Sequence, residues 1–454
     1  MSYQSAIDHL AAMAPELATQ TGQTRRKFSL EEVVILLAAL GNPQRTFPSV
    51  LIAGTNGKGS TAATLASILT ASGLRTGLYT SPHLAHPNER IRIDGVEISD
   101  ADFAEDFFRV RAAGQKLVDE KKLAQSPSFF ETLTAMAFLH FAEPAIEIAV
   151  LEVGLGGRLD ATNVVDPLLS IVTDISLDHM EWLGSTIPEI TREKAGILRP
   201  NGTLITLPQH PEASQVLGEV AAELGVRAVS AAPYMPPPGV GGGQAYPVEA
   251  LGTIVELASP LLGVHQHRNT ALAVAAGVEL RERHGFPITP EAIAGGVRGT
   301  SWPGRLERIA KGGLDWVLDV AHNPAGAWSL RAGLRDTLGG AEDRPWVLVF
   351  SCLRDKPVRE LAQILFPLFK QVIFAPIHSL RATPMEDLMA AAGDSGTPAA
   401  AAGSVSEALE LAREAAGETS PAAGVVVVSG SVYLVGEARQ ILMSCIEHKE
   451  KILS

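Results

Sequence analysis

The chain has 454 residues, of which 46% are hydrophobic and 5% aromatic, and its formal net charge is −13. This apolar fraction excludes wholesale disorder, and at roughly 150 residues per domain the length indicates two or three domains. The acidic balance, with Arg25-Arg26-Lys27 as the one tight basic run, argues against a nucleic-acid partner. No window of about 18 apolar residues occurs, so we expect no membrane span.

The two cysteines, Cys352 and Cys445, are too few for a disulfide framework and lack the spacing of a metal knuckle. We interpret both as reduced structural residues. The first 20 residues lack the basic and apolar segments of a signal peptide. These features together predict a cytoplasmic α/β protein.

In the first 300 residues, short apolar runs alternate with helical patterns. The runs predict strands at 47–53, 146–152, 168–173 and 203–207, and the helical patterns predict helices at 61–71, 128–141 and 265–279. This order predicts βαβ units and a parallel sheet. The Pro/Gly-rich stretch 231–247 cannot be a helix or a central strand and predicts a surface excursion or turn, with a domain boundary as the alternative.

A second alternation begins after the segment 299–304. It predicts strands at 315–320, 346–351, 371–375 and 424–429, with helices at 360–369 and 405–415. The Ala/Gly-biased stretch 391–403 is interpreted as a helix end followed by a loop. We therefore expect two units, residues 1–300 and a smaller α/β unit at 301–454.

A glycine-rich segment, GTNGKGS from Gly54 to Ser60, lies between a predicted strand and a predicted helix. Glycines let backbone N–H groups converge on phosphate oxygens, and a helix N-terminus adds partial positive charge. Lys58 would supply a point charge and Ser60 a hydroxyl for Mg²⁺. The spacing departs from G-x-x-x-x-G-K-[ST], because Gly59 separates Lys58 from Ser60, so a plain glycine-rich turn is the alternative.

Two side chains follow predicted strands at the edge where ligands of parallel sheets bind. Glu152 ends the strand 146–152 and is placed to hold Mg²⁺, although a capping glutamate is the alternative. His179 follows the strand 168–173, and an ordinary hydrogen-bonded histidine is its alternative. Lys194 in REKAGI has, from the residues alone, no signal beyond that of an ordinary helical lysine.

The second unit offers two further candidates. Asp319 ends a predicted strand, where it could accept hydrogen bonds from ribose hydroxyls or cap the helix that follows His322-Asn323-Pro324. Arg305 in WPGRLE could reach phosphates across a cleft, or form a surface salt bridge.

Seven stretches taken together resemble one family. They are AGTNGKGST, SPHLAHPNERI, LEVGLGGRLDATN, DHMEWLGST, EKAGI, WPGRLE and DVAHNP, in this order between about residues 50 and 330. They resemble the folylpolyglutamate synthase and dihydrofolate synthase branch of the Mur ligases, in which the Lys-Gly-Ser loop ending is usual. The resemblance implies a Mur-ligase-like α/β fold. Its parts are an ATP-binding P-loop domain with a mostly parallel sheet and a smaller, Rossmann-like glutamate-ligase domain.

The resemblance also implies site residues. ATP contacts fall on Gly57, Lys58, Gly59, Ser60, Asn269, Arg305 and Asp319, and Mg²⁺ ligands on Ser60, Ser81, Glu152 and His179. Pteroate contacts fall on Phe130, Glu131, Leu159, Asp160 and Ala161. Lys194 matches a lysine that the family carries as a carbamate, and with Lys58 and His179 it forms the expected catalytic set. The segment 25–30 lies where the family's pterin-covering loop begins, but it matches weakly and is left out.

The implied activity is an ATP-dependent ligase that adds L-glutamate to dihydropteroate, to folate tails, or to both, through an acyl phosphate. We favour the bifunctional enzyme over a folylpolyglutamate synthase alone. A Mur-type ligase for another acid and a nucleotide-binding module without catalysis are the remaining alternatives. The expected partners are small molecules, namely ATP, L-glutamate and dihydropteroate or folate. The protein is expected to be a monomer without nucleic-acid or membrane partners.

Overall fold

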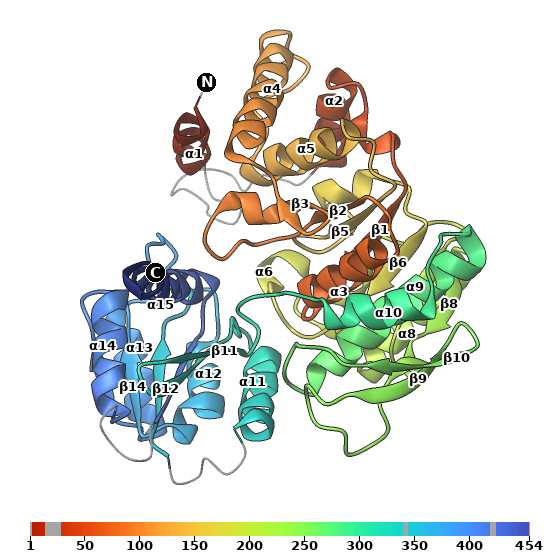
Figure 1. Cartoon of the computed structure of the whole chain (residues 1–454). Coiled ribbons are helices and arrows are strands. Elements are labelled where there is room, and N and C mark those ends of the chain that lie inside the picture. The colour runs from red at the N-terminus through yellow and green to blue at the C-terminus, as the bar shows by residue number, and fades with distance from the viewer. Residues whose placement is uncertain (1, 14–28, 339–343, 418–423, 454) are drawn as a thin grey trace.

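The structure is a computed structural model that describes residues 2–13, 29–338, 344–417 and 424–453. Two α/β bodies lie side by side, the first coloured red to green and the second blue (Figure 1). The first body contains an eight-stranded sheet in the order β4-β3-β2-β5-β1-β6-β7-β8. Its strands are β1 (Ser49–Ala53), β2 (Thr76–Tyr79), β3 (Ile91–Ile93), β4 (Val96–Glu97), β5 (Ile148–Glu152), β6 (Leu169–Val172), β7 (Thr203–Thr206) and β8 (Arg227–Ser230).

The sheet is parallel from β2 to β8, and antiparallel β3 and β4 form one edge. Successive side chains of a strand point to opposite faces, so Leu51 and Ala53 join one hydrophobic core while Val50 and Ile52 join another. Both faces must therefore be covered by helices.

Helices cover the two faces in separate groups. α3 (Lys58–Ala71), α9 (His265–His284) and α10 (Pro290–Arg298) pack on the face of Val50, together with the hairpin of β9 (Tyr246–Ala250) and β10 (Thr253–Leu257). The opposite face packs against α1 (Tyr3–Ala12), α2 (Leu30–Ala39), α4 (Asp100–Asp119), α5 (Phe129–Ala142), α7 (Ile187–Ala195) and α8 (Pro211–Glu223). The short helix α6 (Met180–Leu183) follows β6.

The second body contains a six-stranded sheet in the order β11-β12-β16-β13-β14-β15. Its strands are β11 (Glu307–Lys311), β12 (Leu314–Leu318), β13 (Trp346–Phe350), β14 (Gln371–Phe374), β15 (Ala399–Ala401) and β16 (Val425–Ser429). All neighbours are parallel except β11 and β12. The flanking helices are α11 (Pro324–Thr337), α12 (Val358–Leu365), α13 (Met385–Ser395), α14 (Val405–Ala415) and α15 (Val432–Leu453).

The structure confirms the expected α/β class and every strand and helix predicted above, with ends that differ by a few residues. Three details differ from the sequence interpretation. The stretch 391–403 contains the edge strand β15 as well as a helix end, because alternation is hard to detect in a run of alanines. Asp319 lies one residue beyond β12, and α3 begins at Lys58 rather than at residue 61.

The connection between the bodies runs from residue 299 to residue 306, between α10 and β11. Only strands that follow this connection enter the second sheet. No helix in the described part of the chain is long and apolar enough to cross a membrane.

Candidate active site

The carboxyl ends of the parallel strands in both sheets open onto one cavity of about 1210 Å³. From the first body, its lining includes Ser81 after β2, Gly154 after β5 and His179 after β6. The second body contributes residues that follow four of its own strands, namely Val320, Lys356, His378 and Ser431. Ligands of open parallel sheets bind at the carboxyl ends of the strands. The cavity therefore lies at the ligand-binding edge of both sheets.

The glycine-rich loop has the backbone of a phosphate loop. Gly57 has a φ of 88°, and a Cβ atom there would lie 2.2 Å from Oδ1 of Asn269. At Gly59 a Cβ atom would lie 2.8 Å from the Trp302 ring. Glycine is therefore required at both positions, because the loop passes directly under α9 and the connection between the bodies. Ser60 is buried in the first turn of α3.

Glu152 is a buried carboxylate at the end of β5, and its Oε2 accepts a hydrogen bond of 3.0 Å from the backbone N–H of Ser81. Burial raises the pKa of Glu152, and the positive charges of Lys58, Arg305 and Arg90 oppose that shift. The structure thus brings Ser81 and Glu152 into contact. The carboxylate of Glu152 has lone pairs left with which it can bind a metal cation. The positively charged side chains around it can bind an anion.

The positive charge of Lys58 acts to lower the pKa of three other predicted catalytic or metal-binding residues, Glu152, His179 and Lys194. Lys58 is half-buried at the start of α3, and its Nζ donates to the backbone oxygen of Thr55 at 3.3 Å. His179 adopts a left-handed conformation before α6. Burial and the nearby cations lower its pKa to about 3, so the imidazole is neutral and able to bind a metal at pH 7.

Lys194 is not an exposed helical lysine. It lies near the end of α7 with 4% of its surface exposed, and its Nζ donates a hydrogen bond of 2.7 Å to the backbone oxygen of Gly54. Burial and the charge of Lys58 lower its pKa to about 7, although Asp178 and Asp160 oppose the shift. A substantial fraction of Lys194 therefore carries a neutral amine near pH 7.

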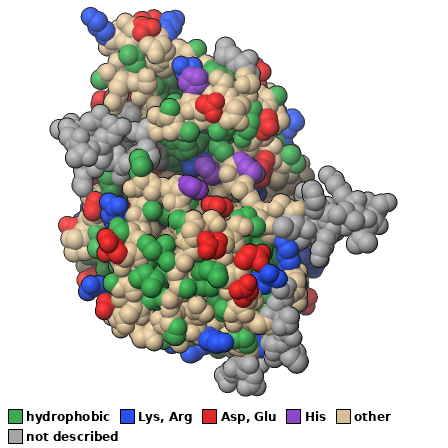
Figure 2. All heavy atoms as spheres, turned by 90° about the vertical axis from the view of Figure 1, so that its left-hand side faces the viewer, with side chains coloured by type: hydrophobic (Ala, Val, Ile, Leu, Met, Phe, Trp, Pro, Cys, Tyr) green, Lys and Arg blue, Asp and Glu red, His purple; other side chains and the backbone are tan. Residues whose placement is uncertain are grey.

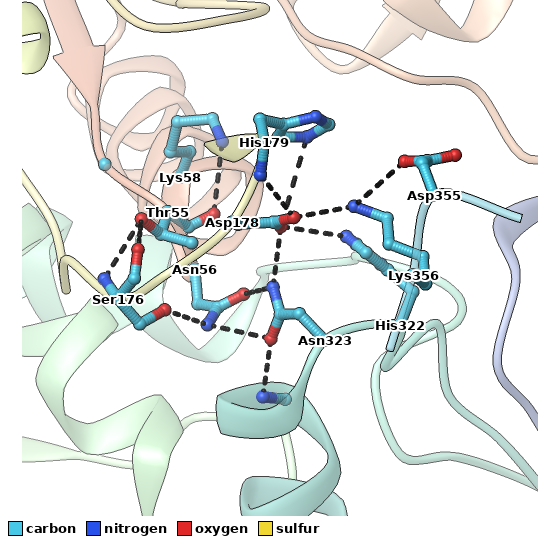
Figure 3. A network of polar contacts seen from close by, with 12 residues as sticks. Thr55, Asn56, Lys58, Ser176, Asp178, His179, His322, Asn323, Asp355 and Lys356 are labelled. Carbon is cyan, nitrogen blue, oxygen red and sulfur yellow. Dashed lines mark hydrogen bonds and ion pairs between the residues drawn. The ribbon is translucent and has the colours of Figure 1, made fainter. Parts of the chain in front are cut away.

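Asp178 joins the two bodies through a network of polar contacts (Figure 3). Its carboxylate accepts from Nζ of Lys356 at 2.7 Å and from Nδ2 of Asn323 at 2.9 Å, and the ring of His322 lies 3.7 Å away. It also accepts from the backbone N–H of His179 at 2.9 Å. Burial would raise the pKa of Asp178, but these partners outweigh burial and hold it well below its usual range.

Sequence reasoning missed Asp178 and Lys356. Asp178 immediately precedes His179, and Lys356 follows β13 in LRDKP, so a strand-end position was the available signal. The two residues are 178 positions apart in the chain, and they pair because the two bodies contact each other.

A second cavity of about 310 Å³ borders the phosphate loop. Gly57, Asn269 and His265 line it from the first body, and Ala325 and Ser329 of α11 line it from the second. Nδ2 of Asn269 donates to Gln266, which holds the amide against the loop. The predicted ATP contacts Gly57 and Asn269 therefore lie together.

Arg305 and Asp319 lie close to one another where the connection between the bodies reaches the second body. Arg305 lines the larger cavity, and Asp319 and Glu152 are the acidic groups nearest its guanidinium, whose pKa burial lowers. The buried carboxylate of Asp319 accepts from the backbone N–H groups of Leu306 and Ala321, each at 2.9 Å. In this structure Asp319 therefore fixes the connection that carries Arg305.

The predicted pteroate residues line the same large cavity. They are Phe130, Glu131, Leu159, Asp160 and Ala161. Phe130 packs so closely on Gly154 that a Cβ there would lie 2.5 Å from its ring. Glu131 completes a capping box with Ser128, and Asp160 accepts from Leu155 and Thr162. Glu131 and Asp160 thus also hold the cavity wall in shape.

Histidine side chains gather at the hollowed middle of the face shown in Figure 2, where the two bodies meet. Those that line the large cavity are His83, His86, His179, His322 and His378. Among the described residues, no group of three or more His, Cys, Asp or Glu side chains could hold a metal alone. A metal at Glu152 and His179 would therefore need further oxygens, which a serine hydroxyl and nucleotide phosphates can supply.

Comparisons with known proteins match both bodies. The family described as Mur ligase middle domain matches residues 52–277, and Mur ligase, glutamate ligase domain matches residues 304–432. The folylpolyglutamate synthase of Lacticaseibacillus casei is 34% identical, covering 98% of this chain and 99% of the relative. The dihydrofolate synthase/folylpolyglutamate synthase of Mycobacterium tuberculosis is 37% identical, covering 92% and 91%.

Solved structures agree over the full fold. Folylpolyglutamate synthase of M. tuberculosis complexed with ADP and AMPPCP has a TM-score of 0.85 at 33% identity, covering 97% of this chain and 99% of that one. FolC of Escherichia coli in complex with DHPP and ADP has a TM-score of 0.81 at 29% identity, covering 98% of each chain.

Proposed function

Because this chain belongs to the folylpolyglutamate synthase and dihydrofolate synthase family of Mur ligases, an ATP-dependent ligase family, we propose that it adds L-glutamate both to 7,8-dihydropteroate and to the glutamate tail of folates. One observation carries the proposal. Both bodies line two cavities: the predicted pteroate residues line the larger one with Ser81, whose backbone N–H donates to the buried carboxylate of Glu152, and Gly57 of the phosphate loop lines the smaller one.

ATP would bind between the bodies. The proposed contacts are Gly57, Lys58, Gly59, Ser60, Asn269, Arg305 and Asp319. The cavity of about 310 Å³ beside Gly57 and Asn269 supports this placement, since α11 of the second body closes it. We also propose 1–300 as the ATP-binding domain and 301–454 as the glutamate-ligase domain, supported by the family matches on either side of residue 300.

The residues around Glu152 fit Mg²⁺. Glu152 offers a buried carboxylate and Ser60 and Ser81 hydroxyl oxygens, which are hard donors that nucleotide phosphates would complete, and His179 adds a neutral imidazole nitrogen. When bound, Mg²⁺ neutralises charge on the phosphoryl group being transferred.

The reaction would proceed in two steps. A carboxylate resists attack by an amine, because oxide is a poor leaving group, so its oxygen first takes the terminal phosphoryl group of ATP to give an acyl phosphate and ADP. The amine of L-glutamate then attacks the carbonyl carbon, phosphate leaves and the nitrogen loses a proton. Lys58 and Arg305 are the cations placed to stabilise charge on the transferred phosphoryl group, and enclosure between two bodies excludes water.

We propose further that Lys194 is carbamylated and, with Lys58 and His179, forms the catalytic set. A neutral amine adds to CO₂ and releases one proton, which leaves an anion on Nζ. The pKa of about 7 supports this step, because near pH 7 it supplies the neutral amine that an exposed lysine lacks. The product anion would also remove the repulsion between Lys194 and Lys58.

The bifunctional assignment is supported by relatives named dihydrofolate synthase/folylpolyglutamate synthase in M. tuberculosis, Bacillus subtilis and E. coli, at 37%, 32% and 31% identity. We extend the proposal to a monomer in a reducing cytoplasm, a compartment that the free, buried thiol of Cys352 supports. The deciding experiment measures ADP and product formation with dihydropteroate and tetrahydrofolate side by side. Turnover must require ATP, glutamate and the acceptor together. Activity with a single acceptor would contradict bifunctionality, and activity with neither would contradict the folate assignment.

A further inference from the structure

Arg90 is a buried cation that forms no ion pair within the described part of the chain. Only 7% of its surface is exposed, and it ends the short helix η2 (Pro87–Arg90) on the wall of the large cavity. Its Nε donates to Nδ1 of His83 at 2.9 Å, and its guanidinium carbon lies 5.2 Å from the ring centroid of Phe129. Neither neighbour is an anion.

The two neighbours hold the guanidinium without neutralising it. Arginine can only donate hydrogen bonds, so Nδ1 of His83 must be the acceptor, and that ring is neutral in this contact. Phe129 offers the face of its ring, which attracts a cation but carries no net charge. A buried charge is unfavourable unless it is paired, so an anion is the expected third partner.

Four other arginines on the cavity wall already have carboxylate partners, whereas Arg305 on the same wall, like Arg90, has no ion pair with a described residue. Arg92 pairs with Glu97, Arg158 with Glu193, Arg381 with Asp355 and Arg439 with Glu307, at N–O distances from 2.6 to 3.1 Å. Arg90 differs from them in being the more buried and in lacking such a partner. The contact with His83 occupies Nε, and the two terminal nitrogens make no hydrogen bond to another described residue, so they can receive a ligand.

The position of Arg90 indicates which anion it receives. Phe129 directly precedes the proposed pteroate residues Phe130 and Glu131, and the charge of Arg90 also acts on Glu152. Arg90 therefore lies on the cavity wall beside the proposed pteroate residues, and its charge reaches Glu152 of the proposed metal site, near which the acid that accepts glutamate must be phosphorylated. A planar guanidinium matches a carboxylate in shape and hydrogen-bonding pattern.

We propose that Arg90 binds the carboxylate of the acid substrate through its terminal nitrogens, and that His83 and Phe129 are positioning residues that hold its guanidinium. This inference rests on the proposed function and assigns the contact that recognises the reacting group. The ligand class is a carboxylate attached to a pterin–arylamine, or the side-chain carboxylate of its glutamate tail. We assign the contacts with the phosphates of ATP to Lys58 and Arg305.

The test compares one ligand with and without its charge. Binding of pteroic acid and of pteroic carboxamide is measured calorimetrically for the wild type, Arg90→Met and Arg158→Met. We expect the wild type to prefer the acid by about 10- to 100-fold, as suits a charge-assisted contact, and Arg90→Met to lose that preference. Arg158→Met, which removes an already paired arginine from the same cavity wall, should retain it.

A merely structural Arg90 would weaken the acid and the carboxamide equally, and that outcome overturns the inference. A preference for the acid that survives in Arg90→Met also overturns the inference. Should Arg90→Met fail to fold, Arg90→Lys serves in its place, because it keeps the charge but not the planar geometry and must show a reduced preference. For positioning, His83→Leu should lose part of the acid preference, whereas His83→Gln, which keeps an acceptor, should restore it.

The same measurement separates this inference from the proposed function. If the wild type binds neither pteroic ligand and forms no product, the proposed function fails. If the wild type ligates glutamate normally while Arg90→Met keeps its acid preference, the proposed function stands and the role of Arg90 is refuted.

Discussion

Lys194 illustrates, at the scale of a single residue, how burial changes the chemistry of a side chain. Its pKa of about 7 lies below the usual 10.5, so between these values the unfolded chain binds a proton that the folded protein does not. Stability contributed by Lys194 therefore rises with pH through this window and falls as the pH drops toward 7. A buried lysine whose pKa is shifted this far is a candidate functional residue.

We expect Lys194→Ala to abolish ligation while ATP binding persists, because the nucleotide contacts lie on the phosphate loop and the second body. A short carboxylic acid such as acetate should restore part of the activity, since it returns the missing anion. Lys194→Arg serves as the control and should not help, because it restores only positive charge. Near-normal turnover in Lys194→Ala, or rescue by Arg, would return Lys194 to an ordinary buried lysine.

Substitutions of Glu152 and His179 should change the Mg²⁺ requirement for turnover while barely changing the stability of the nucleotide-free protein. Burial raises the pKa of Glu152 above its usual 4.5, so its ionisation disfavours the folded state as the pH rises through that window. Glu152→Gln should thus be at least as stable as the wild type at pH 7 without nucleotide, yet need more Mg²⁺ for turnover. His179→Ala should likewise be partly rescued by Mg²⁺.

The measurements are thermal melts of the nucleotide-free variants and turnover titrated with Mg²⁺. Absence of metal rescue together with a loss of several kcal/mol in stability would identify both residues as structural.

At the scale of an element, the strand β1, the loop and the helix α3 act as one phosphate-binding unit. The strand, the loop and the helix follow one another directly in the sequence. Gly57 and Gly59 allow α9 and Trp302 to pack directly on the loop. Because Lys58 is half-buried at the start of α3, its charge acts in a partly water-excluded place.

We expect Lys58→Ala to lower kcat on the order of 10²- to 10³-fold, through loss of electrostatic stabilisation of the transferred phosphoryl group. The melting temperature should change little, since Nζ of Lys58 makes a single long hydrogen bond with Thr55. Single-turnover assays and melts provide the check. A variant within twofold of the wild type would refute the assignment of Lys58.

At the scale of the whole molecule, Asp178 connects the two bodies. It contacts Lys356 and Asn323 of the second body and holds His179 of the first. Since the pKa of Asp178 is lowered, its contribution to stability is present above its unfolded pKa of about 4 and is lost as the pH falls below that value.

A double-mutant cycle of Asp178→Asn and Lys356→Met should reveal a coupling energy of about 1–3 kcal/mol in urea unfolding. Each single variant should be less stable than the wild type, because it leaves the buried partner with fewer contacts. Additive effects of the two substitutions would mean that these side chains do not stabilise the junction together. As a control, Arg413→Ala on α14 lies on the surface and should not couple to Asp178→Asn.

The sequence alone determined the features that depend on near neighbours. Apolar runs of the length of a strand, and a glycine-rich segment between such a run and a helix, identified β1, β5, β6 and the phosphate loop. They also placed Glu152 at a strand end, because strand and loop signals act over a few residues. Long motifs then implied the family, which the comparisons confirm.

Only the tertiary structure decided which side chains are buried together. From sequence alone Lys194 has only the features of an ordinary helical lysine. Its pKa is lowered because folding buries it and brings it near Lys58, with its Nζ against the backbone oxygen of Gly54, 140 residues away in the chain. The pair of Asp178 and Lys356 forms because two sheets meet. Arg90 is enclosed by the cavity wall as a buried cation without an ion pair to any residue that the structure describes. Burial and charge pairing depend on distant segments, so no local pattern in the sequence encodes them.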